Sequence, residues 1–347
     1  MTSEAMNRHR RPSSTTPILE VEGLSIGSSE AEGGMVVVEN LDLTIGRGEV
    51  VALVGESGSG KTMTALSLVR LLPAAFGINN GSIRFDGKEV RTMTTMQLNE
   101  LRGGRIGMIF QQPQAMLDPT ATVGSQVAES LRLHRGLDRR AANARVIELL
   151  REVGIPEPVE RARGYAHQMS GGMAQRVMIA AALSADPDLL IADEPTTALD
   201  VTVQTQILEL LDRQRRERQL AILLITHDLT VVSSLADRVA VMYAGRIVEE
   251  GPTRTVLRQP RHPYTQALLR CSILEARDDQ TLYSIPAGIK SGGEISRGCR
   301  FRPRCATADE HGISEQCERQ EPEFADYAKD CRARCWAVAP FDSPLQG

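Results

Sequence analysis

The chain has 347 residues, 41% of them hydrophobic, and a formal net charge of −4. These values are typical of a globular protein with one large domain and an appendage, and the weakly negative charge argues against a nucleic-acid-binding protein. Its longest apolar runs fall short of the ~18–20 residues that span a bilayer. Residues 1–17 are polar and lack the apolar core of a signal peptide, so we expect a disordered tail on a cytosolic chain.

The first half of the chain predicts an α/β pattern. Apolar runs predict strands at 18–26, 35–45, 49–55, 82–87 and 105–111, with a turn in "SSEAEGG". A helix is expected from Lys61 to about Leu72, before Pro73. Residues 115–187 are rich in Ala, Leu and Arg, and predict a helical insert in which Gly154 ends one helix.

The second half returns to strands and then changes composition. Strands are expected at 189–195 and 221–228, separated by a helix at 201–218, and a hairpin is expected at 238–251. From about 258 the chain is rich in Arg, Pro and Cys and has weak periodicity. This region predicts a separate C-terminal extension.

The stretch "GESGSGKT" at 55–62 has the pattern of a phosphate-binding loop. It stands between an apolar strand and a helix, where backbone N–H groups and the helix N-terminus can hold the phosphates. Lys61 is expected to bridge the phosphates, and the Thr62 hydroxyl to bind Mg²⁺. The residues expected to bind ATP are Gly55, Ser57, Gly58, Ser59, Gly60, Lys61 and Thr62.

Two carboxylates end the apolar strand "LLIADE". We expect Asp193 to hold Mg²⁺ and Glu194 to orient or deprotonate the attacking water. His227 ends the next apolar strand, at the sheet edge where ligands gather, and is a candidate contact of the γ-phosphate. Gln111, at the entry to the helical insert, is a candidate Mg²⁺ ligand and sensor. Taken alone, the residue favours the interpretation of a solvated loop glutamine.

A second anion-binding element follows in "MSGGMAQ". Ser170 is a candidate N-cap, and the two glycines allow close backbone approach at a helix start. One triphosphate does not need two such elements from one compact domain. The pattern therefore favours a dimer in which each element covers the nucleotide of the other subunit.

Six stretches, "GESGSGKT", "FQQP", "MSGGMAQ", "LLIADEP", "TALD" and "ITHD", resemble in order and spacing the ATP-binding-cassette (ABC) ATPase family. The resemblance spans about residues 18–257 and implies a P-loop NTPase fold, with a RecA-like core, an antiparallel β subdomain and an α-helical subdomain at about 112–187. It implies catalytic roles for Glu194, His227 and Gln111, and Mg²⁺ ligation by Thr62, Gln111 and Asp193. It assigns Asp200 to a loop that communicates across the dimer. The implied signature motif facing the partner's ATP comprises Ser170, Gly171, Gly172, Met173 and Gln175.

One feature departs from that family, which usually stacks an aromatic ring on adenine. No aromatic residue lies between Ile18 and Leu72. Either an aliphatic residue such as Ile26 replaces the ring, or ATP is held mainly through its phosphates.

The C-terminal region, residues 258–347, narrows the resemblance. "HPYTQALL" and "GCRFRPRC" resemble the extension of ATPases from oligopeptide and dipeptide importers, in which four cysteines often bind a [4Fe–4S] cluster. The implied ligands are Cys299, Cys305, Cys317 and Cys335, with 5, 11 and 17 residues between them. Zinc is the alternative metal, Cys331 is the alternative fourth ligand, and unliganded structural thiols remain a further interpretation. Cys271 is expected to be a core thiol.

The resemblance implies an ATPase subunit of a di- or oligopeptide importer, bound to the cytoplasmic face of the membrane through its partners. These partners are a second ABC ATPase, identical or different, two permeases and an extracytoplasmic binding protein, with no nucleic acid. Met116, Leu117 and Val123 of the helical insert are candidates for permease contacts or for core positions. The alternatives are an importer of nickel or glutathione, an exporter, and a soluble ABC ATPase of DNA repair or translation.

Overall fold

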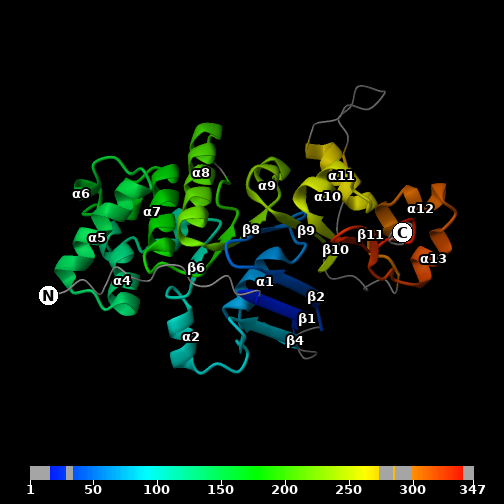
Figure 1. The fold of residues 1–347 in the computed structure, drawn as a ribbon, viewed down its shortest axis with the longest axis horizontal. Coiled ribbons are helices and arrows are strands. Elements are labelled where there is room, and N and C mark those ends of the chain that lie inside the picture. The colour runs from blue at the N-terminus through cyan, green and yellow to red at the C-terminus, as the bar shows by residue number, and fades with distance from the viewer. Residues whose placement is uncertain (1–15, 29–33, 198, 273–283, 286–297, 339–347) are drawn as a thin grey trace, which may run out of the picture.

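The computed structural model describes residues 16–28, 34–197, 199–272, 284–285 and 298–338 (Figure 1). The expected tail up to residue 15, most of the turn in "SSEAEGG" and the last nine residues lie outside the described residues. Within the described ranges, two sheets occupy the middle of the molecule, a block of helices lies at one end, and the C-terminal segment lies at the other. No described helix is both long enough and apolar enough to cross a membrane.

The larger sheet carries the nucleotide-site motifs. Its strands lie in the order β11-β12-β10-β9-β3-β8-β7-β6. Their bounds are β3 (Val50–Val54), β6 (Ile106–Ile109), β7 (Leu189–Asp193), β8 (Ala221–Thr226), β9 (Arg238–Tyr243), β10 (Arg246–Pro252), β11 (Ala325–Ala328) and β12 (Cys331–Ala333). Neighbours from β9 to β6 are parallel, whereas β10, β12 and β11 continue the sheet antiparallel.

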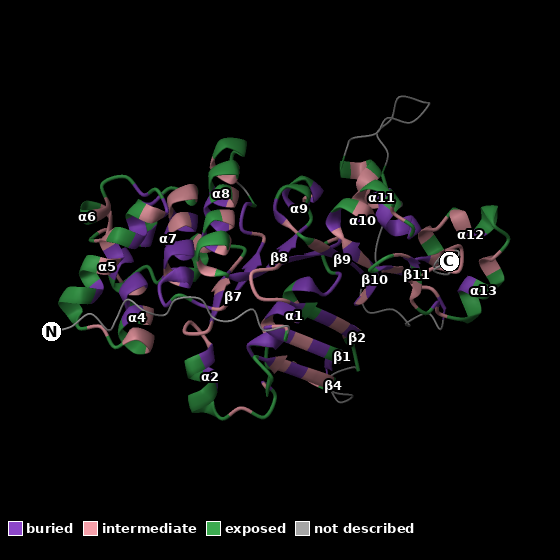
Figure 2. Ribbon diagram, viewed as in Figure 1, coloured by how far each residue is buried: buried purple, intermediate pink, exposed green. Residues whose placement is uncertain are grey.

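The central strands form because their sequences are apolar on both faces. Every residue of β3, β7 and β8 is buried, as Figure 2 shows for this part of the sheet. Continuous Val, Leu and Ile runs suit a parallel sheet covered on both sides. Each fully buried side chain of this kind contributes about 1.5–3 kcal/mol, so these strands form a rigid base for the loops at their carboxyl ends.

The smaller sheet is antiparallel and has the order β2-β1-β4-β5. Its strands are β1 (Leu19–Ser28), β2 (Val36–Ile45), β4 (Phe76–Phe85) and β5 (Lys88–Glu89). The sequence predicted only 82–87 of β4, but the strand begins at Phe76 because it pairs with β1 as far as Ser28. Alternating burial along β1 and β2 places Ile26 in the core of this subdomain.

The expected helical insert is confirmed as a group of helices between β6 and β7. They are α3 (Pro113–Met116), α4 (Val123–Arg135), α5 (Arg139–Glu152), α6 (Pro158–Arg161), the 3₁₀ turn η2 (Ala166–Gln168) and α7 (Gly171–Leu183). Thr122 caps the start of α4, and Asp138 caps the start of α5. Gly154 follows the end of α5 with a φ of +76°. The three candidates for permease contacts differ in burial: Met116 is 54% exposed, whereas Leu117 and Val123 belong to the core.

The remaining helices of the first 272 residues flank the sheets. They are α1 (Lys61–Leu68), α2 (Thr95–Leu101), α8 (Val201–Arg218), α9 (Leu229–Leu235), α10 (Thr253–Arg258) and α11 (Pro263–Ser272). Helix α8 has the predicted bounds. Helix α1 ends earlier than the expected Leu72, because the chain turns at Arg70, which has a φ of +52°.

The C-terminal segment differs from the expected separate extension, since it continues the larger sheet. It contains η3 (Arg302–Arg304), α12 (Thr307–Glu310) and α13 (Ser314–Arg319), followed by β11 and β12. Glu249 and Glu250 of β10 pair with Ala333 and Arg332 of β12. The segment therefore packs against the same sheet that carries the phosphate loop.

Candidate nucleotide site

The phosphate loop connects β3 to α1, as the sequence predicted. Gly60 has a φ of +105°, and a Cβ there would lie 3.0 Å from the Val37 carbonyl oxygen, so both backbone shape and space favour glycine. Lys61 follows as the first residue of α1 and is only 6% exposed. Its Nζ donates to the carbonyl oxygens of Gly55 at 2.8 Å and Glu56 at 2.9 Å.

Burial lowers the pKa of Lys61, while Glu194, Asp193 and Glu56 oppose that shift through their negative charges. A buried ammonium among carbonyl groups is a strong point of attraction for a phosphate oxygen, because little water screens it. The loop carbonyls therefore hold this charge where the first turn of α1 also presents its N–H groups.

Thr62 and Asp193, two of the three expected Mg²⁺ ligands, lie next to each other. The Thr62 hydroxyl donates to Asp193 Oδ2 at 2.8 Å, although 131 residues separate them in the chain. Burial raises the pKa of Asp193 and the hydrogen bond from Thr62 opposes this shift. A hydroxyl and a buried carboxylate form a donor set that suits a hard divalent cation, whose charge would favour the ionised carboxylate.

Glu194 stands at the centre of a polar cluster at the carboxyl end of β7. Gln111 Nε2 donates to its Oε2 at 3.0 Å, the Thr197 hydroxyl donates to the same oxygen at 2.7 Å, and His227 Nδ1 lies 3.0 Å from Oε1. Burial pushes the pKa of Glu194 upward, but the hydrogen bonds from Thr197 and His227 outweigh it, so the pKa is lowered overall. This carboxylate is held ionised and can accept a proton from water.

The structure therefore brings Gln111, Glu194 and His227 together, as the sequence predicted from three separate strand ends. The backbone of Glu194 has a φ of +49°, an uncommon conformation for glutamate, and its N–H donates to the Ile225 carbonyl oxygen at 2.8 Å. Thr197 was missed by the sequence analysis. Its position three residues after Glu194 in a turn was the available signal, since Ser and Thr hydroxyls commonly bond back across such turns.

The serine–glycine stretch opens helix α7, and Ser170 is its N-cap, accepting from the Met173 N–H at 3.3 Å. Ser170 and Gly171 are exposed, and Gly172 and Met173 are partly exposed. In the described part of the chain, no hydrogen bond or ion pair joins this stretch to the phosphate loop. The start of α7 is thus exposed at the surface, and in the described ranges it is not bonded to the phosphate loop of its own chain.

Gln175 and Asp200, two further residues expected at the subunit interface, differ in their exposure. Gln175 is only 3% exposed, so the prediction that it faces a partner's nucleotide is wrong for this structure; it packs inside the domain one turn further along α7. Asp200 is exposed and caps α8, accepting from the Val203 N–H at 2.9 Å. This cap fixes the start of α8.

The proposed replacement of the adenine-stacking ring by Ile26 is wrong. Ile26 is 0% exposed and lies in the core between β1, β2 and β4. A side chain with no accessible surface offers no face to a base.

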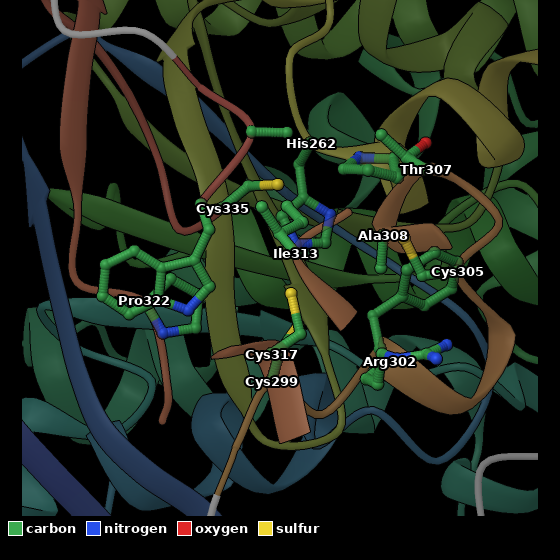
Figure 3. Close-up of a pocket in the computed structure, with 14 residues that line it drawn as sticks. His262, Cys299, Arg302, Cys305, Thr307, Ala308, Ile313, Cys317, Pro322 and Cys335 are labelled. Atoms are coloured by element: carbon green, nitrogen blue, oxygen red, sulfur yellow. The ribbon is translucent and has the colours of Figure 1, made fainter. Parts of the chain in front are cut away.

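A second candidate site lies in the C-terminal segment. Four cysteines, Cys299, Cys305, Cys317 and Cys335, line one cavity together with apolar residues such as Ile313 and Pro322 (Figure 3). Cys331 lies elsewhere, in a small cluster with Tyr327, and Cys271 lies on α11. Burial raises the pKa of Cys299 to about 12 and that of Cys335 to about 11. Among the described residues, no three His, Cys, Asp or Glu side chains are arranged to share a single metal ion.

Comparison with known proteins agrees with this geometry. The ABC transporter family model matches residues 38–197, and that of the oligopeptide/dipeptide transporter C-terminal region matches residues 248–311. The chain is 45% identical over 334 residues to a Brucella ovis protein provisionally named a peptide import ATP-binding protein, covering 93% of this chain and 97% of that one. It is 44% identical over 323 residues, with the same coverage, to the probable D,D-dipeptide transport ATP-binding protein DdpD of Escherichia coli.

Solved structures show the same cassette. The dimeric ATP-binding cassette MJ0796 bound to ADP and Pi matches with a TM-score of 0.62 at 28% identity, covering 68% of this chain and 99% of that one. The protein cbiO1 from Clostridium perfringens, part of the ABC transporter complex cbiONQ, matches with a TM-score of 0.61 at 30% identity, covering 70% and 91%. The chain belongs to the ATP-hydrolysing subunits of the ABC transporter family, in the branch that carries the oligopeptide/dipeptide transporter C-terminal region.

Proposed function

We propose that this chain powers the uptake of di- or oligopeptides across the cytoplasmic membrane, as the ATP-hydrolysing subunit of an importer. One observation carries the transport assignment: a phosphate loop and an exposed serine–glycine helix start occur on one chain, and no hydrogen bond or ion pair joins them among the described residues. The names of relatives at 44–45% identity over nearly the whole chain support a peptide cargo.

In the proposed reaction, the phosphate loop binds the triphosphate and Lys61 attracts its phosphate oxygens. Glu194 accepts a proton from the attacking water, and His227 and Gln111 orient the carboxylate and the γ-phosphate region. Mg²⁺, held by Thr62 and Asp193 with Gln111 as a further ligand, would supply charge neutralisation between the phosphates. The remaining loop residues, Gly55, Ser57, Gly58, Ser59 and Gly60, donate backbone and hydroxyl hydrogen bonds to the phosphates.

The exposed start of α7 indicates how two ATPase subunits would cooperate. Ser170, Gly171, Gly172 and Met173 would cover the ATP of a second cassette subunit, and Asp200 would lie at the same interface. ATP then binds the closed dimer more tightly than the open one and shifts the equilibrium toward closure. Hydrolysis removes that advantage, and the dimer reopens.

Two permease subunits would convert closure into transport, and would hold this chain at the cytoplasmic face of the membrane. The exposed Met116, directly after the loop that contains Gln111, is a suitable apolar contact for a permease helix. An extracytoplasmic binding protein would deliver the cargo to the permeases. In this proposal the RecA-like core, together with the β subdomain, binds and hydrolyses ATP, and the helical subdomain contacts the permeases, as the family resemblance implies.

We also propose that the cysteine cavity holds a [4Fe–4S] cluster. Four thiols line one apolar cavity, and four cysteine thiolates are the usual ligand set of such a cluster. A bound cluster would tie together the segments that contain Cys299, Cys305, Cys317 and Cys335. Its proposed role is structural, as a clip within the C-terminal segment.

Co-purification followed by uptake assays tests the function. The tagged chain is captured from detergent-solubilised membranes, and the retained proteins are identified by mass. Two polytopic permeases and a second ATPase are expected, and the reconstituted complex should import labelled dipeptides with ATP. Retention of only ribosomal or DNA-repair proteins would refute transport. Uptake of nickel or glutathione without peptide uptake would refute the peptide cargo alone.

A further inference from the structure

The C-terminal segment reaches the phosphate loop through one ion pair. Arg304 lies in the turn between Cys299 and Cys305. Its two terminal guanidinium nitrogens, Nη1 and Nη2, donate to Oε2 and Oε1 of Glu56, each at 2.9 Å. The Arg304 side chain is 6% exposed and that of Glu56 is 27% exposed. A bidentate pair with so little exposure is held in one geometry and is poorly screened by solvent.

Glu56 is a member of the phosphate loop, and its charge lies near the phosphate site. It is the second residue of "GESGSGKT", its carbonyl oxygen accepts from Lys61 Nζ, and its negative charge raises the pKa of Lys61. An unpaired carboxylate at this place would repel the phosphates of ATP. Arg304 cancels that charge from outside the loop.

A second group from beyond the cassette holds the same residue. The Glu56 backbone N–H donates to the Tyr264 hydroxyl oxygen at 2.8 Å. Tyr264 packs against Tyr243 and Phe301, with ring centroids 4.6 Å and 5.5 Å away, and Arg304 also donates to the Tyr243 hydroxyl at 3.3 Å. The side chain of Glu56 is therefore held by Arg304 of η3, and its backbone by Tyr264 of α11.

The cysteine cavity shares a wall with this contact. Phe301 lines the cavity and packs against Tyr264. Cys305, another lining residue (Figure 3), follows Arg304 directly in the chain. Any rearrangement of the cavity wall would consequently move Arg304 and Tyr264 relative to the phosphate loop.

We propose that Arg304 is a positioning residue for ATP, which neutralises Glu56 and holds the phosphate loop in its binding conformation, so that the C-terminal segment sets the affinity for nucleotide. This role concerns the ATP site, and is independent of the transported cargo.

The test compares MgATP dissociation constants of the purified full-length chain and its variants. Arg304→Ala should weaken binding about tenfold, because it exposes the phosphates to the bare carboxylate of Glu56. The loss should shrink as salt rises, since ions screen this repulsion. The double variant Arg304→Ala/Glu56→Gln should bind about as well as Glu56→Gln alone. Arg332→Ala, which removes another ion pair between the C-terminal segment and the core, is the matched control.

The thermal unfolding midpoint of each variant separates folding from affinity. If Arg304→Ala does not fold, Arg304→Lys decides the question. Lysine keeps the positive charge but loses the bidentate geometry, so this variant should raise the MgATP dissociation constant about threefold. Unchanged affinity in the folded Arg304 variants would overturn the proposal. A double variant that binds as weakly as Arg304→Ala would also overturn it, because the effect would then not pass through Glu56.

Discussion

Replacing Thr197 with valine tests how the carboxylate of Glu194, the proposed catalytic base, is kept ionised. In the structure, the Thr197 hydroxyl donates to Glu194 Oε2 at 2.7 Å and helps to lower the pKa of that carboxyl against the opposite effect of burial. Valine has nearly the same shape but no donor. We therefore expect Thr197→Val to raise the pKa of Glu194 while the carboxylate stays in place.

The size of the change follows from the strength of the lost bond. A hydrogen bond to a charged group contributes about 1.5–3 kcal/mol, and one pKa unit corresponds to about 1.36 kcal/mol. Thr197 is exposed, so water can replace part of the lost interaction. The lower end applies, and the expected rise is about one unit.

The assay is the pH dependence of kcat for ATP hydrolysis by the assembled complex. Glu194 accepts a proton only when ionised, so the rate falls as the pH drops through its pKa, and the acid limb should move about one unit upward in Thr197→Val. Thr205→Val is the control, because among the described residues that exposed hydroxyl donates to the Val201 carbonyl oxygen of its own helix and lies away from Glu194. An unshifted acid limb with an intact fold would refute the reasoning.

Three further outcomes are expected. Glu194→Gln should bind ATP but lower turnover by about a hundred- to ten-thousandfold; near-normal hydrolysis would remove Glu194 as the base. Cys305→Ser should lose iron, measured by metal analysis after anaerobic purification, whereas Cys271→Ser should keep it; equal iron contents would exclude Cys305 as a ligand. Ile26→Ala should lower the free energy of unfolding by about 2–5 kcal/mol with little change in ATP affinity, and the reverse result would restore Ile26 as a base contact.

The sequence predicted those parts of the fold that depend on local patterns. The buried strands β3, β7 and β8 were found because a continuous apolar run followed by polar residues has few other structural solutions. Helix α8 was predicted with its observed bounds, since Asp200 caps its start and its apolar positions have helical spacing. The four cysteines that line the cavity, Cys335 among them, are those implied by the family resemblance, whereas Cys331 lies in a different cluster.

Features that depend on distant partners could not be read from the sequence. Ile26 was proposed as a base contact because its position in the chain was known but its burial between two neighbouring strands was not. Gln175 follows the exposed start of α7 by only one turn, yet the helix rotates its side chain into the core. The contact of Arg304 with Glu56 joins residues 248 positions apart, and local patterns contain no information on such pairs.

The order of strands explains why one site collects residues from such distant segments. In the larger sheet β8 lies between β3 and β7, and β6 follows β7 at the edge of the parallel part. The carboxyl ends of these parallel strands meet at one edge, which brings Lys61, Asp193, His227 and Gln111 together. At the other side of β3, the continuation through β9 and β10 leads to the C-terminal segment. The phosphate loop and the start of α1 thus lie between Asp193 and Glu194 on one side and Arg304 on the other.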